Sequence, residues 1–315
     1  MVTLFDETPE RIHEAGMELA ARHAVANGAQ ALFLLGSTGE GPWFHERVER
    51  LKRFVKVVPD LVPREVPVLV GAFSRERSPE RYRERLRVLE STTRIDGVVL
   101  APPLDFLLEP NELKTFLTEV ASSTSLPVFF YNNPGAFAGN QIDPAWIGER
   151  EWGALDHLVG LKDSSDSLQY KLDALELWAA TGRNVYSGKE GTFGRLLLET
   201  SPRLRKFAGV VPSIGNLSRL PRALAEAASD RVVETLDEEL NAWRNRFYDL
   251  SEPACKAQRG LKVAFEEAYG SERVGRQPVV TCRTLKPPSE EFRGSLREAL
   301  ARWRRLGHVR LVGGD

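Results

Sequence analysis

The stretch "LVGLKDSS" (158–165) decides how the rest of this sequence is interpreted. Leu158 to Leu161 form a short apolar run of the kind that makes a buried strand. The run ends on Lys162, and acid and hydroxyl residues follow at once. An ammonium group is costly to remove from water, so a lysine at that point needs an exit to solvent or a chemical use. The fold around it determines which.

Apolar runs of similar length recur along the chain, each followed by a loop and a helical pattern. Their lack of polar alternation predicts strands buried on both faces, as in a parallel sheet. The eight runs are "VTLF" (2–5), "ALFLLG" (31–36), "VPVLVGAF" (66–73), "DGVVLAPP" (96–103), "LPVFFYN" (126–132), "LVGLK" (158–162), "NVYSG" (184–188) and "KFAGVV" (206–211).

Amphipathic stretches lie between these runs, for example at 46–58 and 79–92. Alternating strands and helices over residues 1–216 predict an α/β fold, a TIM (β/α)8 barrel. Residues 217–315 are mainly helical in pattern, apart from a weak strand signal at 277–282, and predict a C-terminal helical extension. The alternative is an open doubly wound sheet. "GSTGEG" (36–41) and "SGKEGT" (187–192) do not match the nucleotide-binding fingerprints that it would need.

Composition excludes several partner classes. The 315 residues carry a net charge of -1, which gives no reason to expect nucleic acid or a membrane as partner. No apolar run approaches the ~20 residues that cross a bilayer. The start lacks the features of a signal peptide, and Cys255 and Cys282 are expected to be ordinary thiols, so the prediction is a cytoplasmic protein. No two histidines have the spacing of a metal pair.

Barrel active sites lie at the carboxyl ends of the strands, where Lys162, Tyr131 and the pair Ser37–Thr38 are predicted to meet. A lysine held in an apolar barrel mouth has a lowered pKa, and its neutral amine can form a Schiff base with a ketone. A nearby tyrosine can transfer protons. The "GSTGE" turn (36–40) offers N–H and hydroxyl groups to a small carboxylate. The hypothesis is an enzyme that holds a 2-oxo acid covalently.

Three motifs, "GSTGE" (36–40), "YNNP" (131–134) and "GLKDSS" (160–165), resemble the dihydrodipicolinate synthase / N-acetylneuraminate lyase family of class I aldolases. The resemblance covers nearly the whole chain. It implies a TIM barrel with a C-terminal helical domain and a homo-oligomer, a dimer or a tetramer. It also implies a lysine imine with pyruvate or a related 2-oxo acid, and neither a metal nor an organic cofactor.

The resemblance also implies roles for individual residues. Lys162 matches the Schiff-base lysine and Tyr131 the proton-transferring phenol. Ser37 and Thr38 match the paired hydroxyl residues that relay protons and contact the pyruvate carboxylate, with Ser37 in place of the commoner threonine. Two further positions that line the pocket in the family are matched by Gly188 and Val211.

Departures from the family pattern concern the second substrate. Pro103 and Leu104 stand where true dihydrodipicolinate synthases carry a tyrosine pair, and Ala136 replaces the arginine that grips the aldehyde's carboxylate. Phe106 and Phe137 are expected to make the pocket more apolar. These differences argue against a role in lysine biosynthesis.

The substrate beyond the 2-oxo acid stays open. Residues 191–200 are poor in the polar groups that a sialic acid chain needs. A hydroxylated sugar acid could still be bound by the polar residues Asp163, Ser164, Ser165 and Glu190.

Three functions remain compatible with the sequence. The first is a class I aldolase or lyase acting on pyruvate or a related small 2-oxo acid. The second is a dehydratase or hydratase-aldolase of the same superfamily that acts on a 2-keto-3-deoxy acid. The third is a non-catalytic regulatory protein that binds a 2-oxo acid, although such a protein would not need Lys162, Tyr131, Ser37 and Thr38 together.

Overall fold

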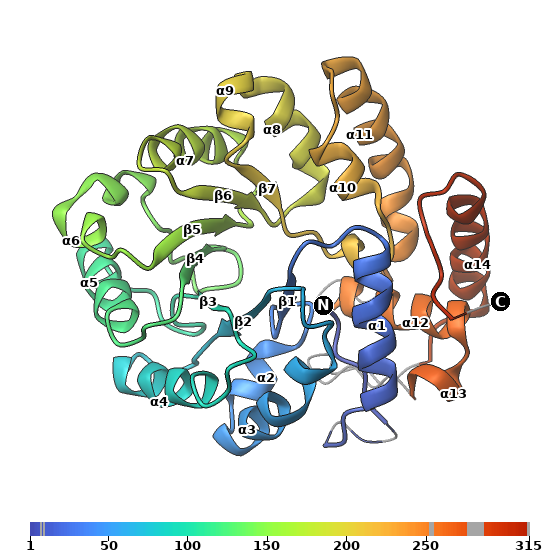
Figure 1. The fold of residues 1–315 in the computed structure, drawn as a ribbon, viewed down its shortest axis with the longest axis horizontal. Helices are drawn as coiled ribbons and strands as arrows, with labels where there is room; N and C mark the ends of the chain where they lie inside the picture. Colours follow the sequence, from blue (N-terminus) through green and yellow to red (C-terminus); the bar gives the residue numbers. More distant parts are fainter. Residues whose placement is uncertain (7, 9, 252–254, 276–286, 314–315) are drawn as a thin grey trace.

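Parallel strands form the centre of the computed structural model, which describes residues 1–6, 8, 10–251, 255–275 and 287–313. Within these residues, seven strands pair in chain order, each parallel to the next. They curl around a common axis, with helices on the outside (Figure 1). The strands are β1 (Leu32–Leu34), β2 (Val68–Ala72), β3 (Gly97–Leu100), β4 (Val128–Asn132), β5 (Leu158–Asp163), β6 (Asn184–Ser187) and β7 (Ala208–Val210).

Helices follow the strands as the sequence predicts, including those expected at 46–58 and 79–92. Three of them, α4, α5 and α9, begin at a proline, which suits a first helical turn because its missing N–H would have no partner there. The helices of this part are α1 (Glu14–Ala26), α2 (Gly41–His45), α3 (Val48–Val57), α4 (Pro79–Leu89), α5 (Pro110–Ala121), α6 (Arg150–Gly153), α7 (Leu168–Ala180), α8 (Phe193–Glu199) and α9 (Pro202–Arg205).

The first expected strand, residues 2–5, is not a strand, and this prediction is wrong. Only Phe5 forms an isolated bridge, to Ile12. Other parts of the chain bind the backbone of this run instead: the N–H of Val2 donates to Asn216 Oδ1 and that of Leu4 to Met17 Sδ. The fold is of the TIM-barrel class, but the described residues contain seven of the eight expected strands and no pairing between β1 and β7.

The C-terminal part is helical, which confirms the predicted extension. Its helices are α10 (Leu220–Ala225), α11 (Asp230–Arg244), α12 (Lys256–Tyr269), α13 (Ser271–Val274) and α14 (Glu290–Arg305). Figure 1 shows α12, α13 and α14 beside α1 at one side of the barrel. Trp303 of α14 is fully buried and packs against Phe247 at a centroid distance of 4.4 Å, with the two rings tilted. The boundary at 216–217 stays a prediction, and the weak strand signal at 277–282 lies outside the described residues.

Cys255, expected to be an ordinary thiol, is buried and disulfide-bonded. The expectation is wrong for this residue, because cysteine spacing alone does not tell whether the chain brings two sulfurs together. The cysteines therefore no longer argue for a reducing compartment. In the part of the chain that the structure describes, no helix has both the length and the apolar character needed to cross a bilayer.

Candidate active site

Lys162 and Tyr131 lie side by side at the carboxyl ends of β5 and β4. The two residues are opposite each other in the parallel register of these strands. The Lys162 Nζ atom is 3.4 Å from the centroid of the Tyr131 ring, and both side chains are buried. The amine near the end of β5 is therefore buried and lies directly against the phenol ring, at the wall of one cavity.

Ser164 links the amine to the phenol. Lys162 Nζ donates to Ser164 Oγ at 3.3 Å, and the Ser164 hydroxyl donates to the Tyr131 oxygen at 3.4 Å. Asn133 Nδ2 donates to the same phenol oxygen at 3.3 Å. From the sequence alone, Ser164 is expected only as a contact to a sugar acid. Its position two residues after Lys162, and so on the same side of the strand, is the signal that would have placed it beside the amine.

Burial lowers the pKa of the Lys162 amine from its ordinary value of 10.5, because the charged form loses its hydration. The neighbouring Tyr131, Asp163 and Glu190 act in the opposite direction without cancelling this effect. A larger fraction of the amine is therefore neutral at a given pH than for a lysine in water. The neutral form is the nucleophile.

The pKa of the Tyr131 phenol is lowered as well, but by its neighbours and not by burial. Burial on its own would raise the pKa of the phenol, but the charge of Lys162 and hydrogen bonds from Lys162, Ser164 and Asn133 outweigh it and lower the pKa to about 8. Phe137 packs edge-on against the Tyr131 ring at a centroid distance of 4.9 Å. A phenol with this pKa can both give and accept a proton near neutral pH.

The "GSTGE" turn lies on the wall of the same cavity. The Thr38 hydroxyl is 2.8 Å from Ser213 Oγ, and the Ser37 carbonyl accepts from Gln258 Nε2 at 3.0 Å. Glu40 ends the turn in a left-handed conformation, with φ 59°, and its buried carboxylate is 2.6 Å from Lys262 Nζ. The turn is thereby held to α12 of the C-terminal extension.

Gly188 and Val211 complete the set of predicted residues. A Cβ at residue 188 would lie 3.2 Å from Lys162 Nζ and would overlap Ser164 Oγ, so the amine needs a glycine there. The N–H of Val211 donates to the Ser187 carbonyl at 2.8 Å. The structure brings all six predicted site residues to one cavity of about 610 Å³ at the barrel mouth: Lys162, Tyr131, Ser37, Thr38, Gly188 and Val211.

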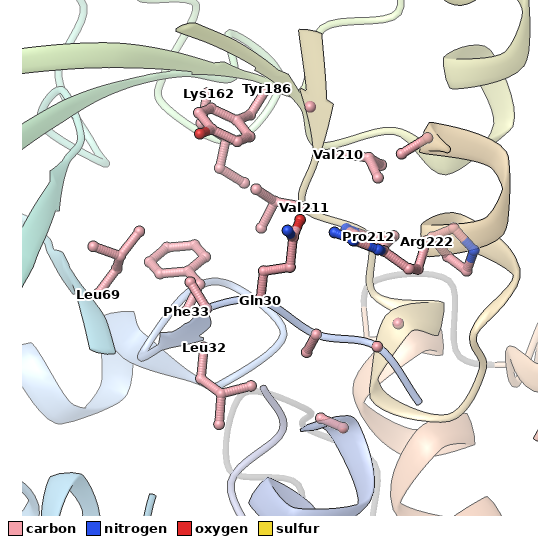
Figure 2. Close-up of a pocket in the computed structure, with 18 of the residues that line it drawn as sticks. Gln30, Leu32, Phe33, Leu69, Lys162, Tyr186, Val210, Val211, Pro212 and Arg222 are labelled. Atoms are coloured by element: carbon pink, nitrogen blue, oxygen red, sulfur yellow. The ribbon is translucent and has the colours of Figure 1, made fainter. Parts of the chain in front are cut away.

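A second cavity of about 600 Å³ lies between β1 and β7 and also includes Lys162. Figure 2 shows its largely apolar wall, with Phe33 from β1, Leu69 from β2 and Val210 from β7. Val211 lines both cavities. The amine therefore lies where a polar mouth meets an apolar space.

Several expected substrate contacts lie elsewhere. Asp163 is fully buried and pairs with Lys171 at 2.8 Å, so its carboxylate is not a sugar ligand. Ser165 donates to this carboxylate at 2.8 Å. Phe106 is 44% exposed and does not line the mouth, so it does not make the pocket apolar as expected.

Ser164 and Glu190 do line the mouth, and the Glu190 carboxylate accepts a hydrogen bond from Tyr248. Across the described ranges, no three His, Cys, Asp or Glu side chains gather as a metal site would require.

The fold and site define a parallel α/β barrel with a buried lysine and a tyrosine at its mouth. The family model described as the dihydrodipicolinate synthetase family matches residues 1–218, and the chain belongs to this family.

Curated relatives match part of the chain. It is 32% identical over 193 residues to the 4-hydroxy-tetrahydrodipicolinate synthase of Oceanobacillus iheyensis, a match over 60% of this chain and 61% of the relative. It is 30% identical over 148 residues to the putative 2-dehydro-3-deoxy-D-gluconate aldolase YagE of Escherichia coli K12, over 46% of each chain. The matched segments thus span about three fifths and one half of these relatives.

The crystal structure of Escherichia coli YagE in complex with pyruvate is similar in fold. Its TM-score is 0.73 at 21% identity, and the match covers 96% of both chains. At this identity the likeness concerns the fold.

Proposed function

We propose that this protein is a Schiff-base-forming class I aldolase or lyase that acts on pyruvate or a related small 2-oxo acid. The observation that carries the proposal is the buried Lys162 amine, 3.4 Å from the Tyr131 ring centroid at the barrel mouth. The pyruvate complex of the similarly folded YagE supports this substrate class.

In the proposed reaction, the neutral Lys162 amine attacks the C2 carbonyl of the 2-oxo acid. Tyr131 protonates the carbonyl oxygen, and its phenolate then takes a proton from the nitrogen. The phenol next protonates the hydroxyl group, which leaves as water and gives the protonated imine. The Tyr131 phenolate then takes a proton from C3, which converts the protonated imine to the neutral enamine. The enamine carbon adds to an aldehyde carbonyl, and the reverse of these steps cleaves the aldol product. The Ser37–Thr38 turn holds the substrate carboxylate, and no metal or organic cofactor takes part.

The same imine supports elimination, so a dehydratase or hydratase-aldolase acting on a 2-keto-3-deoxy acid is the second candidate. Two of the relatives bear names for two different reactions, a synthase and an aldolase. We propose that this chain does not act as a dihydrodipicolinate synthase, because Ala136 lies on the surface and contributes nothing to the mouth.

We also propose a homo-oligomer, a dimer or a tetramer. Phe106 and Leu107, 44% and 62% exposed, form an apolar pair in the loop after β3 that a second copy could cover.

Borohydride reduction in the presence of pyruvate, followed by intact mass and peptide mapping, tests the proposed function. We expect a single reduced pyruvate adduct on Lys162, lost in Lys162→Ala. The control is Lys52→Ala, since Lys52 lies on the surface in α3 with its side chain 54% exposed and should leave the adduct unchanged. No adduct with pyruvate or with a panel of 2-oxo acids would favour the non-catalytic binding protein.

A further inference from the structure

The wall of the mouth that faces the C-terminal extension is rich in cations. Arg244, the last residue of α11, lines the cavity together with Lys189 and Lys256. The acidic side chains on the same cavity are Asp166 and Glu190. These cations can bind a ligand only if the acids of the mouth do not already neutralise them.

Among the described residues, no carboxylate forms an ion pair with Arg244, although the Asp237 carboxylate of the same helix interacts with it electrostatically from farther away. Lys189 pairs with Asp166 at 2.9 Å, and Glu190 accepts from the Tyr248 hydroxyl. Arg244 donates only to amide oxygens, from Nη1 to Asn241 at 3.2 Å and from Nε to Asn245 at 3.4 Å. Its Nη2 group has no hydrogen-bond partner in the part of the chain that the structure describes. A half-buried guanidinium with spare donors at a cavity wall has the charge and the N–H groups to bind an anion.

The position of Arg244 relative to the amine follows from the turn after β6. Gly188 lies next to Lys162, as shown above, and a Cβ at Gly191 would overlap Arg244 Nη1. These glycines are three residues apart, so they are separated by at most about 11 Å. The guanidinium is therefore within reach of the far end of a substrate whose C2 carbon is bound to Lys162.

We propose that Arg244 binds a terminal anionic group, a carboxylate or a phosphate, on the part of the substrate beyond the 2-oxo acid. This inference rests on the proposed aldolase function and makes it more specific. Ala136 leaves the mouth without the arginine that would grip such a group from the "YNNP" side. Arg244 supplies a planar guanidinium from a different element, and this geometry suits carboxylate and phosphate oxygens.

The test compares cleavage of three 2-oxo-3-deoxy sugar acids that differ only at the terminal carbon: CH2OH, carboxylate or phosphate. Pyruvate release gives kcat/KM for each acid. We expect the wild type to prefer at least one anionic acid over the neutral acid by about 10-fold or more, and the preferred terminus identifies which anion is bound. In Arg244→Leu this ratio should fall by about 10- to 100-fold, and Arg244→Lys should restore part of it.

Two further variants test whether the effect is specific to the position of the Arg244 guanidinium. Gly191→Ala should lower the same ratio, because its methyl group displaces the guanidinium. Arg246→Leu is the matched control: Arg246 lies against Trp243 at 4.6 Å, pairs with Glu298 and does not line the mouth, so the ratio should not change.

The outcomes distinguish failure of the Arg244 inference from failure of the proposed aldolase function. Equal kcat/KM for the three acids in the wild type, cleavage of none of them, or an unchanged ratio in Arg244→Leu overturns the inference. In those cases a pyruvate adduct on Lys162 still supports the proposed function. Absence of that adduct in the wild type overturns both.

Discussion

The buried pair Asp163–Lys171 offers a sharp test of how the site is held. Asp163 follows the candidate Schiff-base lysine directly, and Lys171 lies in the first turns of α7. Their charged atoms are 2.8 Å apart, and both side chains are 0% exposed. Asp163 also accepts from Asn132 Nδ2 at 2.6 Å, which ties β5 to β4 beside Tyr131. The pair therefore joins the two strands that bring the amine and the phenol together.

Lys171→Met leaves the Asp163 carboxylate buried without its cation. Breaking a buried ion pair from one side costs about 3–5 kcal/mol, a large part of the 5–15 kcal/mol that typically stabilises a protein. Replacing both partners, as in Asp163→Asn with Lys171→Met, leaves no unpaired charge. We expect the double variant to lose about 0.5–3 kcal/mol less than the sum of the two single losses.

Urea unfolding followed by far-ultraviolet circular dichroism measures these losses. Lys52→Met is the control, because it removes a lysine from the exposed pair with Glu49 and should leave the unfolding midpoint unchanged. A loss below about 1 kcal/mol in Lys171→Met, or strictly additive losses in the double variant, would refute the reasoning.

Two other predictions concern proton transfer at the amine and the phenol. Burial places the pKa of the Lys162 amine below 10.5. The rate of borohydride trapping with pyruvate should therefore rise with pH and level off before pH 10.5. A rate that still rises past that pH would contradict the lowered pKa. Tyr131→Phe should slow hydrogen–deuterium exchange at the pyruvate methyl group, followed by NMR, by ~10²-fold or more. It should also remove the titration near pH 8 from the exchange profile, since the pKa of this phenol is about 8, and an unchanged rate would exclude Tyr131 from the mechanism.

Local patterns predicted most of the sheet. The runs that became β2 to β6 lack polar alternation because both faces of these strands are covered, and this property is visible in the residues themselves. The run at 2–5 looks the same, yet it does not pair with β1 or β7. An apolar run shows only that a segment is buried, whereas a strand also needs a neighbouring backbone, which lies elsewhere in the sequence.

The candidate site was likewise predictable from the sequence only in part. Residue types at the ends of the apolar runs located Lys162, Tyr131, Ser37 and Thr38, because the ends of parallel strands must meet at one mouth. The pairing of Asp163 with Lys171, and hence its loss as a substrate contact, depends on how α7 packs against β5. No pattern within either segment records that packing.

By itself, the sequence determined the alternation of strands and helices, and with it the edge at which the amine, the phenol and the hydroxyl turn gather. Only the tertiary structure decided which charges neutralise one another, and that Arg244, from the C-terminal extension, joins the wall of the mouth. The physical reason is the separation in sequence of the residues involved. Burial and strand ends follow from neighbouring residues, whereas charge pairing depends on distances of a few ångströms between segments far apart in the chain.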